Sequence, residues 1–142
     1  MDEQPLQAGR DEALVAALGL VNRVIQLDTA AEAFLRQCRA GPGSSELAAE
    51  GRRLLGAYQE LSAALADTGV AGTTAEAVAA TLQHHMRLLR TALDLIYRPQ
   101  TEPVATQRQR LVGLGPTTER LVELRDQLAG EISPDALNPL GW

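Results

Sequence analysis

The stretch from Thr73 to Tyr97 limits the possible folds of this chain more than any other part. Its apolar residues fall three and four positions apart on more than one row, the spacing of side chains that share a helix face. A helix with so wide an apolar arc needs neighbours on several sides. We therefore expect 73–97 to form the central helix of a bundle. The apolar residues are Val78, Ala79, Leu82, Met86, Leu88, Leu89, Ala92, Leu93, Leu95 and Ile96.

Two further apolar rows predict one long helix over 11–39, beginning near Asp11. Asp28 and Thr29 could start a new helix, but the repeat continues through them. Residues 1–10 are expected to be a flexible polar lead-in. The longer row is Ala17, Leu20, Val24, Leu27, Ala31, Phe34 and Cys38, and the second is Leu14, Leu18, Val21 and Ile25.

The next helix is expected after the break at 41–45, where Gly41 suits the left-handed end of a helix and Ser44 or Ser45 can cap the next one. Its apolar row is Leu47, Gly51, Leu54, Tyr58, Leu61 and Leu65. Glycine inside a helix costs about 1 kcal/mol relative to alanine. A close approach of two helices explains Gly51, and the sequence offers no such reason for Gly56.

The remaining chain predicts the end of the bundle. Thr73 or Thr74 can cap the central helix, with Glu76 as the reciprocal partner of Thr73, and Pro99 ends that helix. A short polar helix is expected over 104–112, and another helix from Pro116 to about Gly130. The proline-rich segment 133–142 is expected to be an irregular tail, whose Leu137, Leu140 and Trp142 could pack back onto the bundle.

These segments predict an all-α fold, an antiparallel up-down four-helix bundle with a short additional helical segment. No stretch of five residues alternates convincingly between apolar and polar, so no sheet is expected. Aromatic residues are only 3% of the chain, and the core must be built from Leu, Val and Ala. Residues 11–132 are expected to form a single domain.

The charge and composition exclude several functions. The net charge of −5 speaks against general binding to nucleic acid, which usually needs a basic face. All basic residues are arginine, so no lysine Schiff base or phosphate-binding loop lysine is possible. We expect no membrane span and no secretory signal. With the single cysteine Cys38, a bacterial cytoplasm is the expected location.

His84 and His85 are the only histidines, and adjacent positions on a helix point about 100° apart, so the two cannot grip one metal together. His85 lies on the apolar row, where a half-buried imidazole bonded to one carboxylate or carbonyl is expected. The Glu-x-x-His pattern of di-iron bundles is absent, because Thr81 and Leu82 stand in the required places. We expect no metal, no cofactor and no catalytic set.

Arg87, Arg90 and Arg98 form a polar stripe with Asp94 on the central helix. At a spacing of four residues, Asp94 can pair with Arg90 and Arg98, which leaves Arg87 unpaired. The stripe is either a solvated surface or a docking face for an acidic partner, since arginine binds carboxylates through two parallel hydrogen bonds.

Three functions stay open from the sequence. The first is a non-enzymatic interaction protein, an adaptor, chaperone-like binder or homodimerisation module that acts through helix–helix contacts. The second is a bundle that binds a small ligand in a pocket near His85, Tyr58 and Cys38. The third is an enzyme that uses His85 with an acid from another helix.

Overall fold

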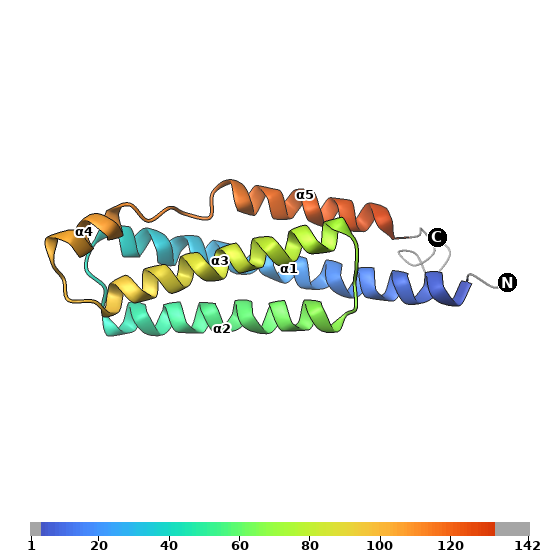
Figure 1. Ribbon diagram of the computed structural model, residues 1–142, viewed down its shortest axis with the longest axis horizontal. Coiled ribbons are helices and arrows are strands. Elements are labelled where there is room, and N and C mark those ends of the chain that lie inside the picture. Colours follow the sequence, from blue (N-terminus) through green and yellow to red (C-terminus); the bar gives the residue numbers. More distant parts are fainter. Residues whose placement is uncertain (1–3, 133–142) are drawn as a thin grey trace.

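Four long helices pack antiparallel in a bundle, and a fifth, short helix closes one end (Figure 1). The computed structural model describes residues 4–132, and this part contains no strand. The all-α bundle expected from the sequence is confirmed. The helices are α1 (Gln4–Ala40), α2 (Ser45–Asp67), α3 (Thr73–Tyr97), α4 (Glu102–Gln109) and α5 (Pro116–Glu131).

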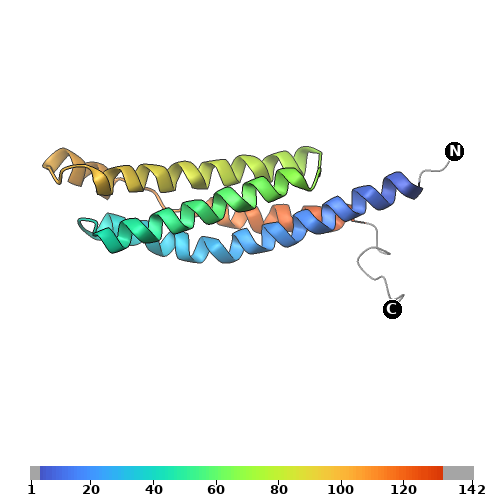
Figure 2. The same ribbon diagram turned by 90° about the horizontal axis from the view of Figure 1, so that it is seen from below.

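The helices surround a core in which α1 and α3 each contact both α2 and α5. Helices α1 and α3 also touch each other, whereas α2 and α5 lie on opposite sides of them. Helix α5 begins only part-way along the bundle, so α4 and the connection 110–115 cover the remaining length of α1 and α3 (Figures 1 and 2). Val104, Leu111 and Leu114 are the buried residues of this stretch.

The first helix differs from its prediction in its start and in its buried face. It begins at Gln4 rather than near Asp11, and its first turns project beyond the turn between α2 and α3 (Figures 1 and 2). Leu20 and Leu27, which were expected in the core, are only partly buried. The buried seam takes residues from both predicted rows and has strict three-four spacing: Leu14, Ala17, Val21, Val24, Asp28, Ala31, Leu35 and Cys38.

The helix ends confirm some predicted caps and correct others. Ser44 caps α2, because its hydroxyl accepts a hydrogen bond from the Leu47 amide at 3.0 Å. Thr73 is not a cap: α3 starts there, after Gly72 at φ 112°, a backbone region that glycine enters without a steric penalty. Gly41 does not adopt a positive φ, so its predicted left-handed conformation is wrong.

The short helix is also shifted, since α4 covers Glu102–Gln109 rather than 104–112. Thr101 caps it by accepting a hydrogen bond from the Val104 amide, and Pro103 stands in its first turn, where a missing amide proton costs nothing. The cap thus moves the start of the helix two positions toward the N-terminus.

Helix α1 has the length and apolar composition of a membrane-crossing helix over Gly9–Ala40. The likeness is weak, because a core helix of a soluble protein has the same properties. Within this helix, 28% of the most apolar stretch of 18 residues is buried inside the bundle. The absence of a membrane span stays a prediction.

The two glycines inside α2 differ in their surroundings. A Cβ added at Gly51 would lie 2.5 Å from Cζ of Phe34 and 2.7 Å from Cδ2 of Leu93, so α1 and α3 approach α2 closely here. A Cβ added at Gly56 would meet nothing within 4 Å. The close helix approach expected at Gly51 is confirmed, and Gly56 has no packing role.

We therefore expect opposite results from two alanine substitutions in α2. Gly51→Ala should lower the free energy of unfolding by about 1–3 kcal/mol, because the methyl group pushes Phe34 and Leu93 away from α2. Gly56→Ala should raise it by about 0.5–1 kcal/mol through better helix propensity. Urea unfolding followed by circular dichroism measures both. A destabilised Gly56→Ala variant would contradict this assignment.

Candidate functional site: a buried polar layer

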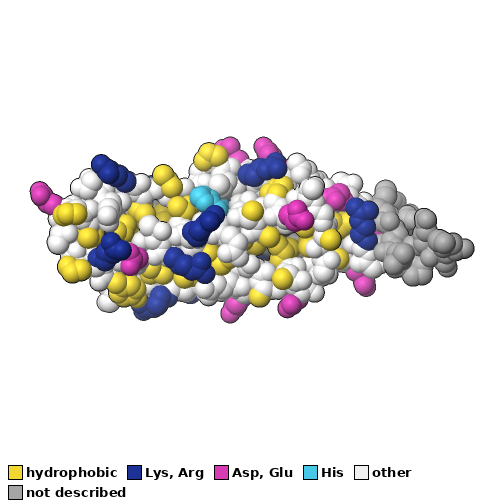
Figure 3. Space-filling view, viewed as in Figure 1, with side chains coloured by type: hydrophobic (Ala, Val, Ile, Leu, Met, Phe, Trp, Pro, Cys, Tyr) yellow, Lys and Arg dark blue, Asp and Glu magenta, His cyan; other side chains and the backbone are white. Residues whose placement is uncertain are grey.

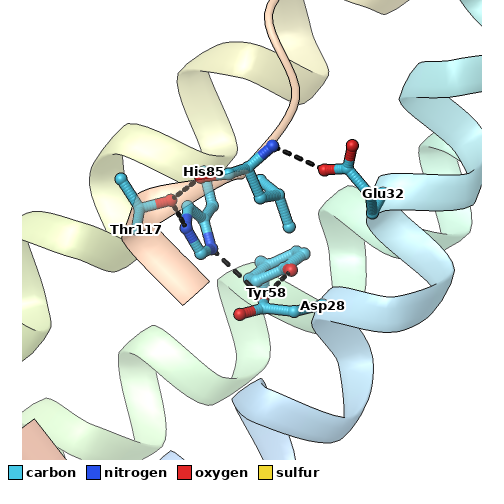
Figure 4. Close-up of polar contacts among 6 residues, drawn as sticks. Asp28, Glu32, Tyr58, His85 and Thr117 are labelled. Carbon is cyan, nitrogen blue, oxygen red and sulfur yellow. Dashed lines mark hydrogen bonds and ion pairs between the residues drawn. The ribbon is translucent and has the colours of Figure 1, made fainter. Parts of the chain in front are cut away.

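Each of the four long helices places one polar side chain on its inward-facing row at the same level of the bundle (Figure 4). These residues are Asp28 of α1, Tyr58 of α2, His85 of α3 and Thr117 of α5. Asp28, Tyr58 and His85 are fully enclosed, with exposed fractions of 2%, 0% and 0%. We call these four residues the polar layer.

The carboxylate of Asp28 is the centre of the polar layer. The Tyr58 hydroxyl donates a hydrogen bond to Oδ1 of Asp28. Nδ1 of His85 lies 3.2 Å from the same oxygen, within ion-pair distance but outside hydrogen-bond geometry. The Tyr58 and His85 rings meet edge to face, with centroids 5.7 Å apart. Oδ2 of Asp28 has no hydrogen-bond partner within the described chain.

The hydrogen bonds of Thr117 decide which ring nitrogen of His85 carries a proton. The Thr117 hydroxyl donates its single proton to the Leu114 carbonyl at 2.5 Å. Nε2 of His85 lies 2.8 Å from the same hydroxyl oxygen and must therefore donate to it. A proton on Nδ1 as well would turn the contact with Asp28 into a buried ion pair, while a bare Nδ1 would face the carboxylate with its lone pair.

The polar layer continues into the connection between α4 and α5. Oε2 of Glu32 accepts a hydrogen bond from the Leu114 amide at 2.6 Å (Figure 4). Arg39 holds the same segment, because it lies 3.8 Å from Glu32 and donates to the Leu111 carbonyl at 3.3 Å. A Cβ at Gly113 would meet Oε1 of Glu32 at 2.2 Å, so a larger residue here would displace the carboxylate of Glu32.

Burial and the neighbouring acid set the protonation of Tyr58. Desolvation raises the pKa of the phenol far above its usual range, and the charge of Asp28 and the hydrogen bond to it raise it further. Tyr58 therefore remains a hydrogen-bond donor. Burial lowers the pKa of His84 on the flank of α3, and the neighbouring His85 and Arg87 lower it further.

The structure brings together two of the three residues suggested as a ligand site. His85 and Tyr58 are in contact, but Cys38 lies ten residues beyond Asp28 on α1, about 15 Å further along the helix axis. His85 contacts a carboxylate as expected, yet it is fully rather than half buried.

Asp28 and Thr117 were not anticipated as members of a site. Asp28 stands on the three-four row Leu14, Leu18, Val21, Ile25, and an acid in line with aliphatic residues is a signal of a buried partner. Thr117 has no comparable signal, because it falls in the first turn of a helix where threonine is common.

The polar layer has the residue order of a nucleophilic triad, since an acid faces one ring nitrogen and a hydroxyl the other. A triad needs a histidine that accepts the hydroxyl proton and a surface that substrate can reach. Here Nε2 already carries the proton, Thr117 donates to a carbonyl, and the His85 ring is 0% exposed. The hydrogen bonds are those of a structural network.

The described residues contain no metal-ligand cluster, and no similar protein is found. No group of three or more His, Cys, Asp or Glu residues in the described part of the chain could hold a metal ion. Searches of protein families, curated proteins and solved structures find no match.

The polar stripe of α3 lies on the surface as expected. Arg87, Arg90, Asp94 and Arg98 are all exposed. Arg98 pairs with Asp94 at 2.8 Å, which confirms one of the two predicted pairs. Arg90 makes no ion pair within residues 4–132, so the other predicted pair is absent, and Arg87 is unpaired as expected.

Removing the Asp28 carboxylate or the Tyr58 hydroxyl from the polar layer should lower the free energy of unfolding, and the two losses should differ in size. Asp28→Ala leaves the Tyr58 hydroxyl without its acceptor and removes the carboxylate beside the His85 ring, and should cost about 3–5 kcal/mol of unfolding free energy. Tyr58→Phe removes one hydrogen bond and should cost about 1–3 kcal/mol. Denaturant unfolding measures both, with Asp94→Ala as the exposed control, for which less than about 1 kcal/mol is expected. Equal effects of Asp28→Ala and Asp94→Ala would refute the central role of Asp28.

Because the thiol of Cys38 is buried, the free energy of unfolding should decrease at alkaline pH. Desolvation raises the pKa of Cys38 from 9.0 to about 11, and Arg108 offsets only part of this. As the pH rises, the thiol ionises in the unfolded chain before it ionises in the folded protein. The stabilisation from the buried neutral thiol is therefore complete below pH 9 and is lost between pH 9 and 11. Unfolding free energy should fall by about 2–3 kcal/mol more in the wild type than in Cys38→Ala over that range. Parallel pH profiles would contradict this.

Proposed function

We propose that this protein is a non-enzymatic interaction module that binds an acidic protein segment through the exposed side of α3. The surface consists of Arg87, Arg90 and Arg98 of α3, the neighbouring Arg52 of α2, and Tyr97. We call it the arginine face. The observation that carries the proposal is that Arg87 and Arg90 are exposed and have no ion-pair partner in the described chain, on a protein whose net charge is −5.

The residue types on the arginine face suit a protein partner. Tyr97 is 61% exposed, whereas Phe34 and Tyr58 are buried, and the guanidinium of Arg52 lies 5.9 Å from the Tyr97 ring centroid. Arginine and tyrosine are the residue types that most often dominate protein interfaces. Basic side chains gather over the half of the bundle that contains the end of α3 (Figure 3).

The arrangement of charges favours an acidic partner. The Arg98–Asp94 pair is half exposed and contributes little to stability, so these side chains are available to a partner. The unpaired Arg87 and Arg90 can each bind a carboxylate through two hydrogen bonds. A local positive face on an acidic protein also steers an acidic segment toward one orientation.

Burial weighs against the other two functions suggested by the sequence. A small ligand or substrate at His85 would have to pass side chains that leave His85 and Tyr58 0% exposed and Cys38 1% exposed. Self-association stays a prediction, and the arginine face does not favour it, because like charges would meet across a two-fold axis.

The test is the binding of a fluorescein-labelled poly-glutamate peptide, measured by fluorescence anisotropy at low salt. The double variant Arg87→Glu, Arg90→Glu should weaken binding about tenfold or more, since each tenfold change needs only about 1.4 kcal/mol. The matched control is Arg23→Glu, Arg36→Glu, which reverses two exposed arginines of α1 with the same change in net charge. The control should bind like the wild type.

Two outcomes would overturn the proposal. Equal weakening in both double variants would mean that net charge, not the arginine face, controls binding. Tighter binding to a DNA duplex than to the peptide, lost in the Arg87→Glu, Arg90→Glu variant, would assign the face to nucleic acid instead.

A further inference from the structure

A second surface lies at the opposite end of the bundle from the C-terminal end of α3. There α1 projects beyond the turn between α2 and α3, so its first turns have no helix opposite them on that side (Figures 1 and 2). A pocket of about 410 Å³ lies between the first turns of α1 and the turn that joins α2 to α3. Its lining residues are Gly9, Arg10, Ala13, Leu14, Thr68, Gly69, Val70 and Ala71.

The lining of this pocket is small and aliphatic, apart from Arg10 and Thr68. An adjoining hollow of about 340 Å³ shares Val70 and Ala71 and continues over Leu65 and Ala75 toward α3. Together they form an open, mostly apolar surface whose polar members are Arg10, Ser62, Thr68 and Glu76. We call it the end pocket.

The chain leaves α5 beside the end pocket. Glu131, the last residue of α5, lies 3.6 Å from Arg10, which lines the pocket. Ile132 follows and is still buried, at 5% exposed. Any segment after Ile132 therefore starts next to the pocket.

The sequence after Ile132 has the composition that the pocket fits. Residues 133–142 contain Leu137, Leu140 and Trp142, with Pro134 before all three and Pro139 between the two leucines. An extended chain spans about 3.3–3.6 Å per residue, so five residues already reach about 17 Å. Proline also reduces the freedom of the unbound segment, which lowers the entropy lost on docking.

We propose that residues 133–142 dock in the end pocket of their own molecule, with Leu137, Leu140 and Trp142 against Ala13, Val70 and Ala71. The short tether decides for this occupant over a second copy or another protein. A tether of a few residues gives an effective concentration in the millimolar range, which exceeds that of a free competitor in dilute solution. This proposal does not rest on the arginine face.

Trp142 is the only tryptophan, so its fluorescence reports on this segment alone. We expect blue-shifted emission and protection from acrylamide in the native protein, both independent of protein concentration. Val70→Asp should shift the emission to that of the urea-unfolded chain. Val112→Asp is the matched control, because it adds the same charge to another loop, at a valine that is 59% exposed; its emission should stay blue-shifted. Circular dichroism checks that both variants fold.

Three results would overturn the docking. Emission equal to that of the unfolded chain at all concentrations would mean that the segment does not bind. A blue shift that grows with protein concentration would assign the pocket to a second copy. A blue shift that survives Val70→Asp would place the segment elsewhere on the bundle.

Discussion

The carboxylate of Asp28 is the contact on which the interior of this bundle depends. One of its oxygens receives the Tyr58 hydroxyl and faces the His85 ring, so α1, α2 and α3 meet at a single atom. His85 extends the chain of contacts to Thr117 at the start of α5. A purely aliphatic core tolerates a helix that slides by one heptad, whereas a slide here would leave a buried acid against apolar side chains. We therefore expect the polar layer to favour one register of the four helices.

Because the polar layer is closed, the functional candidates of the protein lie on its surface. The arginine face occupies the half of the bundle where α3 ends, and the end pocket lies where α3 begins. The two surfaces differ in chemistry, since one offers guanidinium groups and an exposed tyrosine and the other offers small aliphatic side chains. We propose binding at both surfaces, through different chemistry at each.

Much of the fold could be predicted, because helical spacing reads directly from apolar residues. The single long helix through Asp28, the Ser44 cap and the close approach at Gly51 each follow from local sequence. The site was harder to predict. His85 was expected against a carboxylate, but Asp28 as its partner was not, because α1 and α3 are far apart in sequence. Cys38 was expected near His85, but it lies about 15 Å further along the axis of α1 than Asp28.

The sequence by itself determined that this chain forms amphipathic helices, where most of them end, and that the central helix carries a polar stripe of arginines in which Arg87 is unpaired. These properties depend on residues within a few positions of one another, which side-chain spacing reveals. Only the tertiary structure decided which helix row faces inward in α1, which polar groups meet in the core, and that α1 overhangs the turn between α2 and α3. Those features depend on the relative depth and rotation of helices, which packing across the whole bundle fixes.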